Sequence, residues 1–293
     1  MAALDLRPLS LGELLDRTFF LYRRHFLLFF GIAAIPYSIF FVVHLVTALL
    51  PILAGPGDYG NMRAARFVTA SIGGGLFGFV GAFVGGVAYL FSLGATVYGV
   101  SEIYKGRETT IRECLRHVRG KTGIIFGVLI LSGLLVIAGL IALVIPGIYL
   151  LCRICVAVSA ALLEDTGPAD SIRRSFALTK NFAGRAFMIY LLYFVVIWGV
   201  LALFQFPFII LIVAYAKQTQ LVVLWTVLMQ VGNFIGSSLV TPVILIALVL
   251  FYYDLRVRKE AFDLQMMMQA IGADPMPPPI TGGVPSMFGR DAT

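Results

Sequence analysis

The chain has 293 residues, of which 60% are apolar by type and 13% carry a formal charge. An average soluble domain is about 45–50% apolar and about 25% charged. The mean hydropathy is +0.95, and the apolar residues form continuous blocks rather than an alternating pattern. This composition excludes a soluble enzyme, a disordered protein or a nucleic-acid-binding domain as the main body, and it predicts an all-α polytopic membrane helical bundle.

The apolar blocks predict six transmembrane helices. A helix needs about 20 residues to cross the hydrocarbon core, and five nearly uncharged blocks reach that length. Residues 122–163 are about twice as long as one crossing requires, and the Pro146-Gly147 pair inside them favours a sharp turn. We therefore split that block and predict spans at about 26–50, 68–100, 123–145, 148–163, 186–215 and 222–253, of which the fourth is short.

Lysine and arginine are distributed unevenly between the loops. If the N-terminus is cytoplasmic, all but four of the 22 lysines and arginines lie on the cytoplasmic side; the exceptions are Arg63, Arg66, Lys217 and, within the fourth span, Arg153. Short loops rich in Lys and Arg stay in the cytoplasm. We therefore predict a multi-pass membrane protein with both termini cytoplasmic. Its net charge of +7 then faces anionic lipid rather than nucleic acid.

A short amphipathic segment precedes each odd-numbered span. Ser10 with Glu13 and Thr110 with Glu113 fit capping boxes, and Pro168 suits the first position of a helix. The predicted apolar faces are Leu11, Leu14, Leu15, Tyr22 and Phe26; Ile111, Cys114, Leu115 and Val118; and Ala169, Ile172 and Phe176. The pattern predicts three units, each an interfacial helix followed by a transmembrane pair. These helices either bind lipid headgroups or a protein partner, or only ease each span into the membrane.

The C-terminal region changes in composition after the sixth span. We expect the last helix to continue to about Ile271, so that residues 1–271 form one integral membrane domain. Residues 272–293 are rich in Pro and Gly and predict a flexible tail. Such a tail is either a disordered terminus or a docking segment for a protein partner.

Arg153 is the one charge in the middle of a predicted span. A charge at mid-membrane is costly and often functional. It lies about 9 Å along the helix from the proposed outer turn, so we expect its side chain to extend outwards. Two interpretations stay open: Arg153 binds a lipid phosphate or an anionic substrate, or it pairs with carbonyls freed at Pro146 or with the outer loops.

Two further stripes follow a helical spacing. Gln230, Asn233, Ser237 and Thr241 share one face of the sixth span, where they either line a polar cavity or form hydrogen bonds between helices. The second span carries Gly74, Gly78, Gly81 and Gly85 on one face. Small residues at this spacing allow a neighbouring helix to approach closely, so we expect these glycines to serve helix packing.

The histidines and cysteines do not predict a metal, a cofactor or a catalytic group. His25, His44 and His117 are not spaced as metal ligands. Cys152 and Cys155 form a C-x-x-C pair, but they lie in an apolar span without a second pair. We interpret them as packing residues, with a redox role as the alternative.

Several segments together resemble a bacterial six-helix family labelled the membrane domain of glycerophosphoryl diester phosphodiesterase, with its YciC-like relatives. They are residues 6–18 (LRPLSLGELLDRT), Pro146-Gly147-Ile148-Tyr149, Arg153, Glu164, Arg174-Ser175, Leu178-Thr179, residues 252–260 (YYDLRVRKE) and residues 262–264 (FDL). The resemblance covers about residues 5–265. Where the family often has a glycine soon after the Leu-Thr pair, this chain has Lys180-Asn181-Phe182.

The resemblance implies a membrane domain rather than an activity. Some relatives are fused to a phosphodiesterase barrel, but many stand alone without an assigned activity, and no stretch of this chain accommodates such a barrel. We therefore expect a non-catalytic envelope or lipid-associated accessory module whose partners are membrane lipids. The alternative is a small-solute or lipid transporter or channel with a polar cavity near Arg153.

Overall fold

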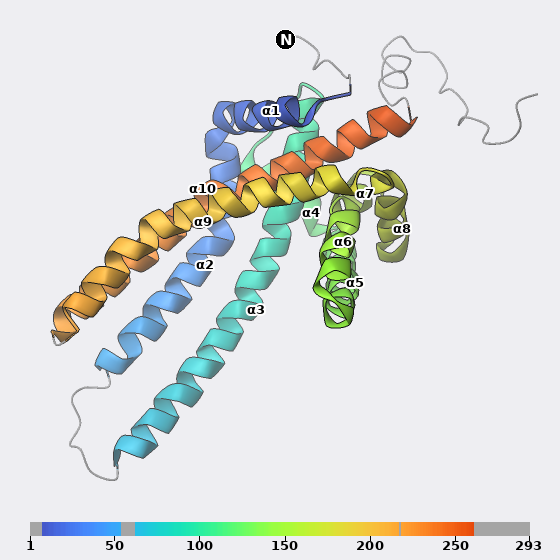
Figure 1. Cartoon of the computed structure of the whole chain (residues 1–293). Helices are drawn as coiled ribbons and strands as arrows, with labels where there is room; N and C mark the ends of the chain where they lie inside the picture. The colour runs from blue at the N-terminus through green and yellow to red at the C-terminus, as the bar shows by residue number, and fades with distance from the viewer. Residues whose placement is uncertain (1–7, 54–61, 217, 261–293) are drawn as a thin grey trace, which may run out of the picture.

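The computed structural model describes residues 8–53, 62–216 and 218–260; the side chains of residues 48–53, 62–74, 76, 77 and 219 lie outside this description. The described residues form ten α-helices in a polytopic bundle (Figure 1). Six segments are long and apolar enough to cross a membrane: Phe26–Thr47, Gly78–Tyr104, Thr122–Ala142, Val144–Leu163, Ala183–Ala214 and Gln220–Glu260. The predicted all-α architecture with six crossings is confirmed. The predicted tail, residues 272–293, lies outside the described residues.

The helices follow one another as three units. In the first, α1 (Leu11–Arg24) precedes the pair α2 (Phe26–Leu53) and α3 (Met62–Tyr104). In the second, α4 (Ile111–Arg119) precedes α5 (Thr122–Ala142), which turns back into α6 (Val144–Ile154) and α7 (Ala157–Leu163). In the third, α8 (Pro168–Thr179) precedes α9 (Ala183–Ala214) and α10 (Thr219–Glu260). This order is the one that the amphipathic segments predict.

The helix starts follow local sequence signals. The Ser10–Glu13 and Thr110–Glu113 pairs form both hydrogen bonds of a capping box at α1 and α4. Pro168 occupies the first turn of α8, as expected. The capping bonds from Thr110 also lower the pKa of the Glu113 carboxyl, because they stabilise its charged form.

The second hairpin turns earlier than the Pro-Gly pair predicts. Leu143 alone separates α5 from α6, and its backbone is extended (φ −171°, ψ 151°). Pro146 is the third residue of α6, where a missing N–H costs no helical hydrogen bond. The fourth crossing therefore spans 20 residues, longer than the short span that we expected. Its helix is interrupted between Ile154, where α6 ends, and Ala157, where α7 begins.

Gly147 has a packing role in this hairpin rather than a turning role. A Cβ at Gly147 would lie 2.8 Å from the backbone nitrogen of Leu140, and one at Gly139 would lie 3.0 Å from the Cα of Gly147. The backbones of α5 and α6 touch here because neither glycine carries a side chain.

One end of the bundle carries the polar contacts between the three units. At this end lie α1, α4, α8 and the end of α10 (Figure 1). We call it the base. The 42 residues of α10 span about 63 Å, more than one crossing needs, and its final stretch, Tyr252–Glu260, continues among the helices of the base. The N-terminal segment and the end of α10 thus lie on one side, as an even number of crossings requires.

Two of the predicted apolar faces differ from the observed ones. In α1 the predicted Leu14 is buried, but Phe26 is 37% exposed, and Thr18 and Leu21, which were not predicted, are buried. In α8, Ala169 is exposed, and the buried side includes Ser171, Ser175, Ile172, Leu178 and Thr179. This side is partly polar because α8 packs against the interruption between α6 and α7, where backbone groups need hydrogen-bond partners.

Of the glycines predicted to share one face of α3, Gly81 and Gly85 contact α2, whereas Gly78 does not. A Cβ at Gly81 would lie 2.2 Å from Val43, and one at Gly85 would lie 2.6 Å from Phe40. Gly78 has no atom within 4 Å of such a Cβ, so it does not share this contact. The surroundings of Gly74 lie outside the described residues.

Replacing Gly81 with alanine is expected to destabilise the protein by about 1–3 kcal/mol, because the β-branched Val43 has little freedom to move aside. The change is measured as a shift of the thermal unfolding midpoint in detergent. Gly78→Ala is the matched control on the same helix and should leave the midpoint unchanged or raise it. Equal midpoints for the two variants would contradict the packing role of Gly81.

Candidate functional site

Asp254 is the centre of the first polar cluster at the base. Its side chain is completely buried, and its Oδ2 lies 2.9 Å from Arg185 Nη1 and 3.0 Å from Arg258 Nε. The backbone N–H of Leu9 donates to Asp254 Oδ1 over 2.7 Å. The Leu9 carbonyl in turn accepts from Arg185 and Arg258. One carboxylate therefore joins the segment before α1 to α9 and α10.

Glu164 is the centre of the second cluster. It follows α7, and its two carboxylate oxygens lie 3.0 and 2.8 Å from Nε of Arg174 in α8. The Tyr252 hydroxyl donates to Glu164 Oε1 over 2.7 Å. Glu260 pairs with Arg174 and Arg256. This cluster joins the α7–α8 connection to α10.

Glu102 and its neighbours at the end of α3 make the third cluster. Glu102 is 8% exposed and pairs with Lys105 at 3.2 Å and Arg107 at 3.4 Å. The adjacent Ser101 shares a 2.9 Å hydrogen bond with the Tyr253 hydroxyl. The Tyr253 ring also stacks on Tyr104, with 4.6 Å between the ring centroids. These contacts join α3 to α10.

All three clusters converge on one stretch of α10, residues Tyr252–Glu260, which we call the hub segment. The first unit binds it through Leu9 and Ser101, the second through Glu164, and the third through Arg174 and Arg185. From the sequence, this stretch was noted only for its resemblance to the six-helix family. The signal in its sequence is an aromatic pair followed by three basic residues that lie between Asp254 and Glu260.

Arg153 faces the base rather than the outer turn, which corrects the expectation from the sequence. Its Nη2 donates to the Phe176 carbonyl in the last turn of α8 over 2.7 Å, and its Nη1 donates to the Tyr149 hydroxyl over 3.2 Å. The guanidinium lies over the Phe176 ring at 5.1 Å. The partner carbonyl therefore belongs to α8 and not to the turn near Pro146, because α8 packs alongside α6.

The backbone at Arg153 explains the polar face of α8. The interruption after Ile154 leaves carbonyls of the last turn of α6 without helical partners. The Ser175 and Thr179 hydroxyls donate to the Arg153 carbonyl over 2.8 and 3.0 Å. Both the side chain and the backbone of Arg153 therefore fasten α6 to α8.

Asn181, in the connection between α8 and α9, has a left-handed backbone conformation. Its φ is +73°, in the left-handed region that glycine adopts without cost and asparagine more readily than most residues. The chain makes its turn between α8 and α9 at this residue, so the asparagine stands where a glycine would serve.

The polar stripe of α10 hydrogen-bonds to neighbouring side chains. The Gln205 amide of α9 donates to Asn233 over 2.8 Å, and Asn233 donates to Gln230 over 3.3 Å. The Thr241 hydroxyl lies 2.7 Å from that of Tyr37 in α2. Ser237 is half-buried on the same face. Asn233 and Thr241 therefore join α10 to neighbouring helices, and Gln230 hydrogen-bonds to Asn233 within α10.

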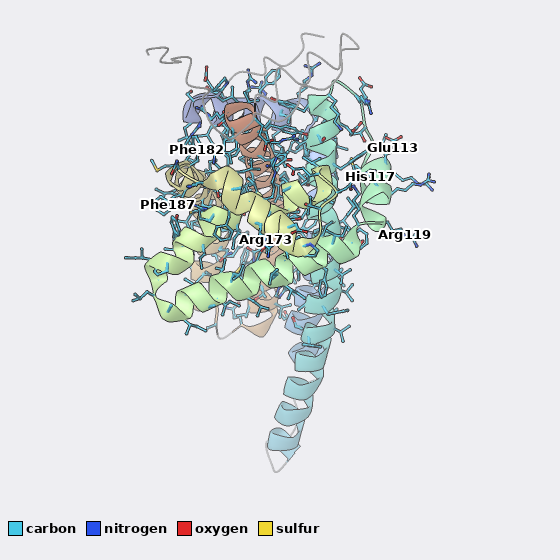
Figure 2. All side chains as sticks on the ribbon, turned by 90° about the vertical axis from the view of Figure 1, so that its right-hand side faces the viewer. Glu113, His117, Arg119, Arg173, Phe182 and Phe187 are labelled. Carbon is cyan, nitrogen blue, oxygen red and sulfur yellow. The ribbon has the colours of Figure 1, made fainter. Side chains whose placement is uncertain are left out.

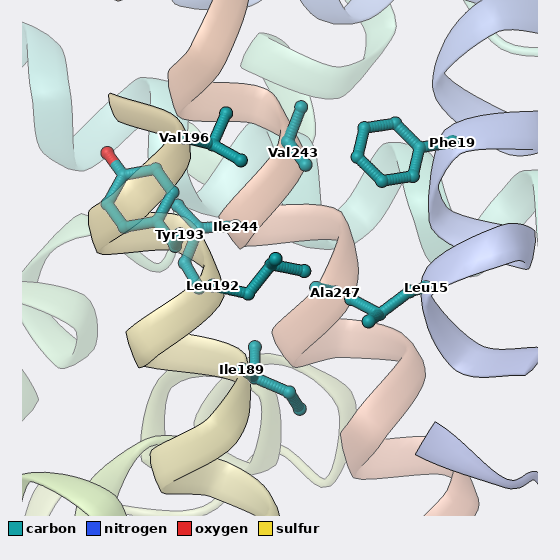
Figure 3. Close-up of a pocket in the computed structure, with 9 residues that line it drawn as sticks. All are labelled: Leu15, Phe19, Ile189, Leu192, Tyr193, Val196, Val243, Ile244 and Ala247. Atoms are coloured by element: carbon teal, nitrogen blue, oxygen red, sulfur yellow. The ribbon is translucent and has the colours of Figure 1, made fainter. Parts of the chain in front are cut away.

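A shallow apolar crevice lies between α1, α9 and α10 (Figure 3). Leu15 and Phe19 of α1 form one wall, Ile189 of α9 belongs to the other, and Ala247 of α10 contributes to the floor. The lining is almost entirely apolar, and Tyr193 is the residue in it that carries a polar group.

The cysteines and histidines are dispersed over the described chain. Cys114, Cys152 and Cys155 are free thiols, and burial raises the pKa of Cys114. His117 projects from α4 beside Glu113 and Arg119 (Figure 2) and stacks on Tyr98 at 4.0 Å. Burial, followed by the charge of Lys121, lowers the pKa of His117. Among the described residues, no group of three or more His, Cys, Asp or Glu is placed to hold a metal ion.

Comparisons of the chain with protein-family models, curated proteins and solved structures gave no match.

Proposed function

We propose that this protein is a non-catalytic, lipid-associated accessory module of the bacterial cytoplasmic membrane. The observation that carries the proposal is that its buried carboxylates form ion pairs with basic side chains. Within the described residues these are Glu102 and Asp254, and both are held by lysine or arginine at the base. The Asp254 carboxylate joins α10 to α9 and to the segment before α1. A carboxylate held by lysine or arginine is not free to act as a general base or an ion-coupling group.

The outer surface of the helices supports an association with lipid. α9 exposes large apolar side chains along its length, among them Phe194, Trp198 and Phe206. Next to Arg23 and Arg24, α1 exposes Phe19 and Phe20. Apolar and basic side chains exposed together are typical of helices that lie in the headgroup region.

The distribution of charge supports a cytoplasmic base. The loops that carry most lysines and arginines are those that meet at the base, which by the positive-inside rule favours the cytoplasmic side. α4 presents Arg112, Arg116 and Arg119 on its exposed face, where they favour anionic lipid or an acidic protein partner.

A deletion strain tests this function. Loss of the gene is expected to weaken the envelope, measured as greater sensitivity to detergent and osmotic downshift, and the wild-type gene should restore resistance. A chain with Cys152→Ala, Cys155→Ala and His117→Gln should restore it equally, because the module needs no thiol or imidazole chemistry. An unaffected deletion strain, or failure of this triple variant at normal abundance, would contradict the proposal.

A transporter or channel is the second candidate, and the polar group of Gln205, Gln230 and Asn233 between α9 and α10 is the observation that favours it. Arg153, its other proposed element, is bound to α8. Flux through reconstituted vesicles tests it, with Asn233→Leu and Arg153→Ala as variants. Flux that disappears in these variants would support transport and count against an accessory role alone.

A further inference from the structure

Three cationic residues from different elements lie at the C-terminal end of α8. Lys180 is the residue that follows the last turn of α8, Lys259 of the hub segment donates to the Ala177 carbonyl over 2.6 Å, and Arg153 of α6 donates to the Phe176 carbonyl. The charges of Arg153 and Lys180 both act on the Lys259 ammonium. The C-terminus of a helix carries a partial negative charge of about one half, which three full positive charges exceed.

These cations differ from the other basic residues around them. Arg174, Arg185, Arg256 and Arg258 each pair with a carboxylate within 4 Å. Within the described chain, Arg153, Lys180 and Lys259 have no such pair. Glu260, the residue after Lys259, pairs with Arg174 and Arg256. The end of α8 therefore has an excess of positive charge.

Hydrogen-bond donors remain at this position. A lysine ammonium has three N–H groups; Lys259 uses one of them on Ala177, and Lys180 is exposed. Arg153 Nε is buried and has no partner among the described residues. The Tyr149 hydroxyl accepts from Arg153 and keeps its own hydrogen to donate. Several donors with positive charge suit the oxygens of a phosphate.

The apolar surface beside the cations favours a lipid over a free phosphate. The Lys259 ammonium lies 5.7 Å from the centroid of the Phe182 ring. Phe182 directly precedes α9, and Phe187 lies in the first turns of that helix. Figure 2 shows both phenylalanines on one side of the molecule. Phe187 and Met188 of α9 and Tyr149 of α6 are 43%, 49% and 51% exposed. A headgroup at the cations would thus have its acyl chains against apolar side chains.

We infer that Arg153, Lys180 and Lys259 form a binding site for the phosphate of an anionic phospholipid whose acyl chains lie along α6 and α9. This inference rests on the lipid association proposed above and assigns it to one position. The cations supply the headgroup contacts, and the fastening of α6 to α8 by Arg153 holds them in place.

Retention of phosphatidylglycerol by the full-length protein tests the site. Protein in phosphatidylcholine nanodiscs is titrated with phosphatidylglycerol, and the bound lipid is counted by native mass spectrometry. The double variant Lys180→Gln and Lys259→Gln is expected to bind phosphatidylglycerol about 30-fold more weakly, since each basic residue near a membrane surface contributes about 1 kcal/mol and about 1.4 kcal/mol is a factor of ten. Arg173→Gln, which removes an exposed charge from α8, is the control and should bind as the wild type does.

Three other results would change the assignment of this site. Equal affinity of the double variant and the wild type, at unchanged thermal stability, would overturn the site. Inorganic phosphate that competes as well as the lipid would overturn the assignment to a lipid and leave a phosphate site. Restoration of the deletion strain by the double variant separates the two proposals, because the accessory function would then stand without this site.

Discussion

Replacing Asp254 with asparagine is expected to lower the thermal unfolding midpoint more than any other single charge change in this protein. The variant leaves Arg185 and Arg258 facing each other around a buried neutral amide and weakens the tie to Leu9. Breaking a buried ion pair costs about 3–5 kcal/mol, which for a chain of this size corresponds to a midpoint roughly 10 °C lower. The midpoint is measured by scanning fluorimetry in detergent.

Asp170→Asn is the matched control. Asp170 is an exposed carboxylate on α8 that lies 3.8 Å from Arg173, and surface pairs of this kind contribute about 0–1 kcal/mol. Adding Arg185→Gln to Asp254→Asn should recover part of the lost stability, because it removes one of the cations left without a partner. Equal midpoints for Asp254→Asn and Asp170→Asn would show that the hub segment does not hold the base together.

Replacing Gly147 with alanine is expected to open the second hairpin. The added Cβ would meet the backbone nitrogen of Leu140 at 2.8 Å, and a backbone atom in a helix has no rotamer by which to move away. Overpacking of this kind costs about 1–3 kcal/mol, occasionally more. We expect a lower unfolding midpoint. We also expect α5 and α6 to separate more often, which exposes the hairpin and is measured as faster cleavage by added protease.

Gly133→Ala in α5 provides the comparison. A Cβ at Gly133 meets nothing within 4 Å, and alanine favours a helix over glycine by about 1 kcal/mol. This variant should therefore be as stable as the wild type or more so. If Gly147→Ala behaved like Gly133→Ala, the close contact between α5 and α6 would not contribute to the fold.

The features that the sequence predicts correctly are those with local causes. The six crossings follow from continuous apolar runs, and the starts of α1 and α4 follow from residues three positions apart, Ser10 with Glu13 and Thr110 with Glu113. The three-unit order follows because each interfacial helix lies directly before its hairpin. The turn of the second hairpin was placed three residues late, since Pro146 is tolerated within the first turn of α6.

The features that the sequence does not predict depend on contacts between distant residues. Leu9 and Asp254 are 245 positions apart, and neither residue alone indicates that the other is its partner. The direction of Arg153 was wrong because its partner, the Phe176 carbonyl, is brought to it by the packing of α8 on α6. Gly78 has the same spacing as Gly81, but spacing alone does not determine which glycines meet the neighbouring helix.

Cysteine accessibility in spheroplasts tests most directly the claim that three hairpins join at one cytoplasmic base. In a chain with its own cysteines replaced by alanine, single cysteines are introduced at Arg107, Arg173 and Gln218, all of which are exposed. An impermeant maleimide should label Gln218→Cys from outside, and should label Arg107→Cys and Arg173→Cys only after the membrane is broken. Labelling of Arg107→Cys or Arg173→Cys in intact spheroplasts would contradict the account.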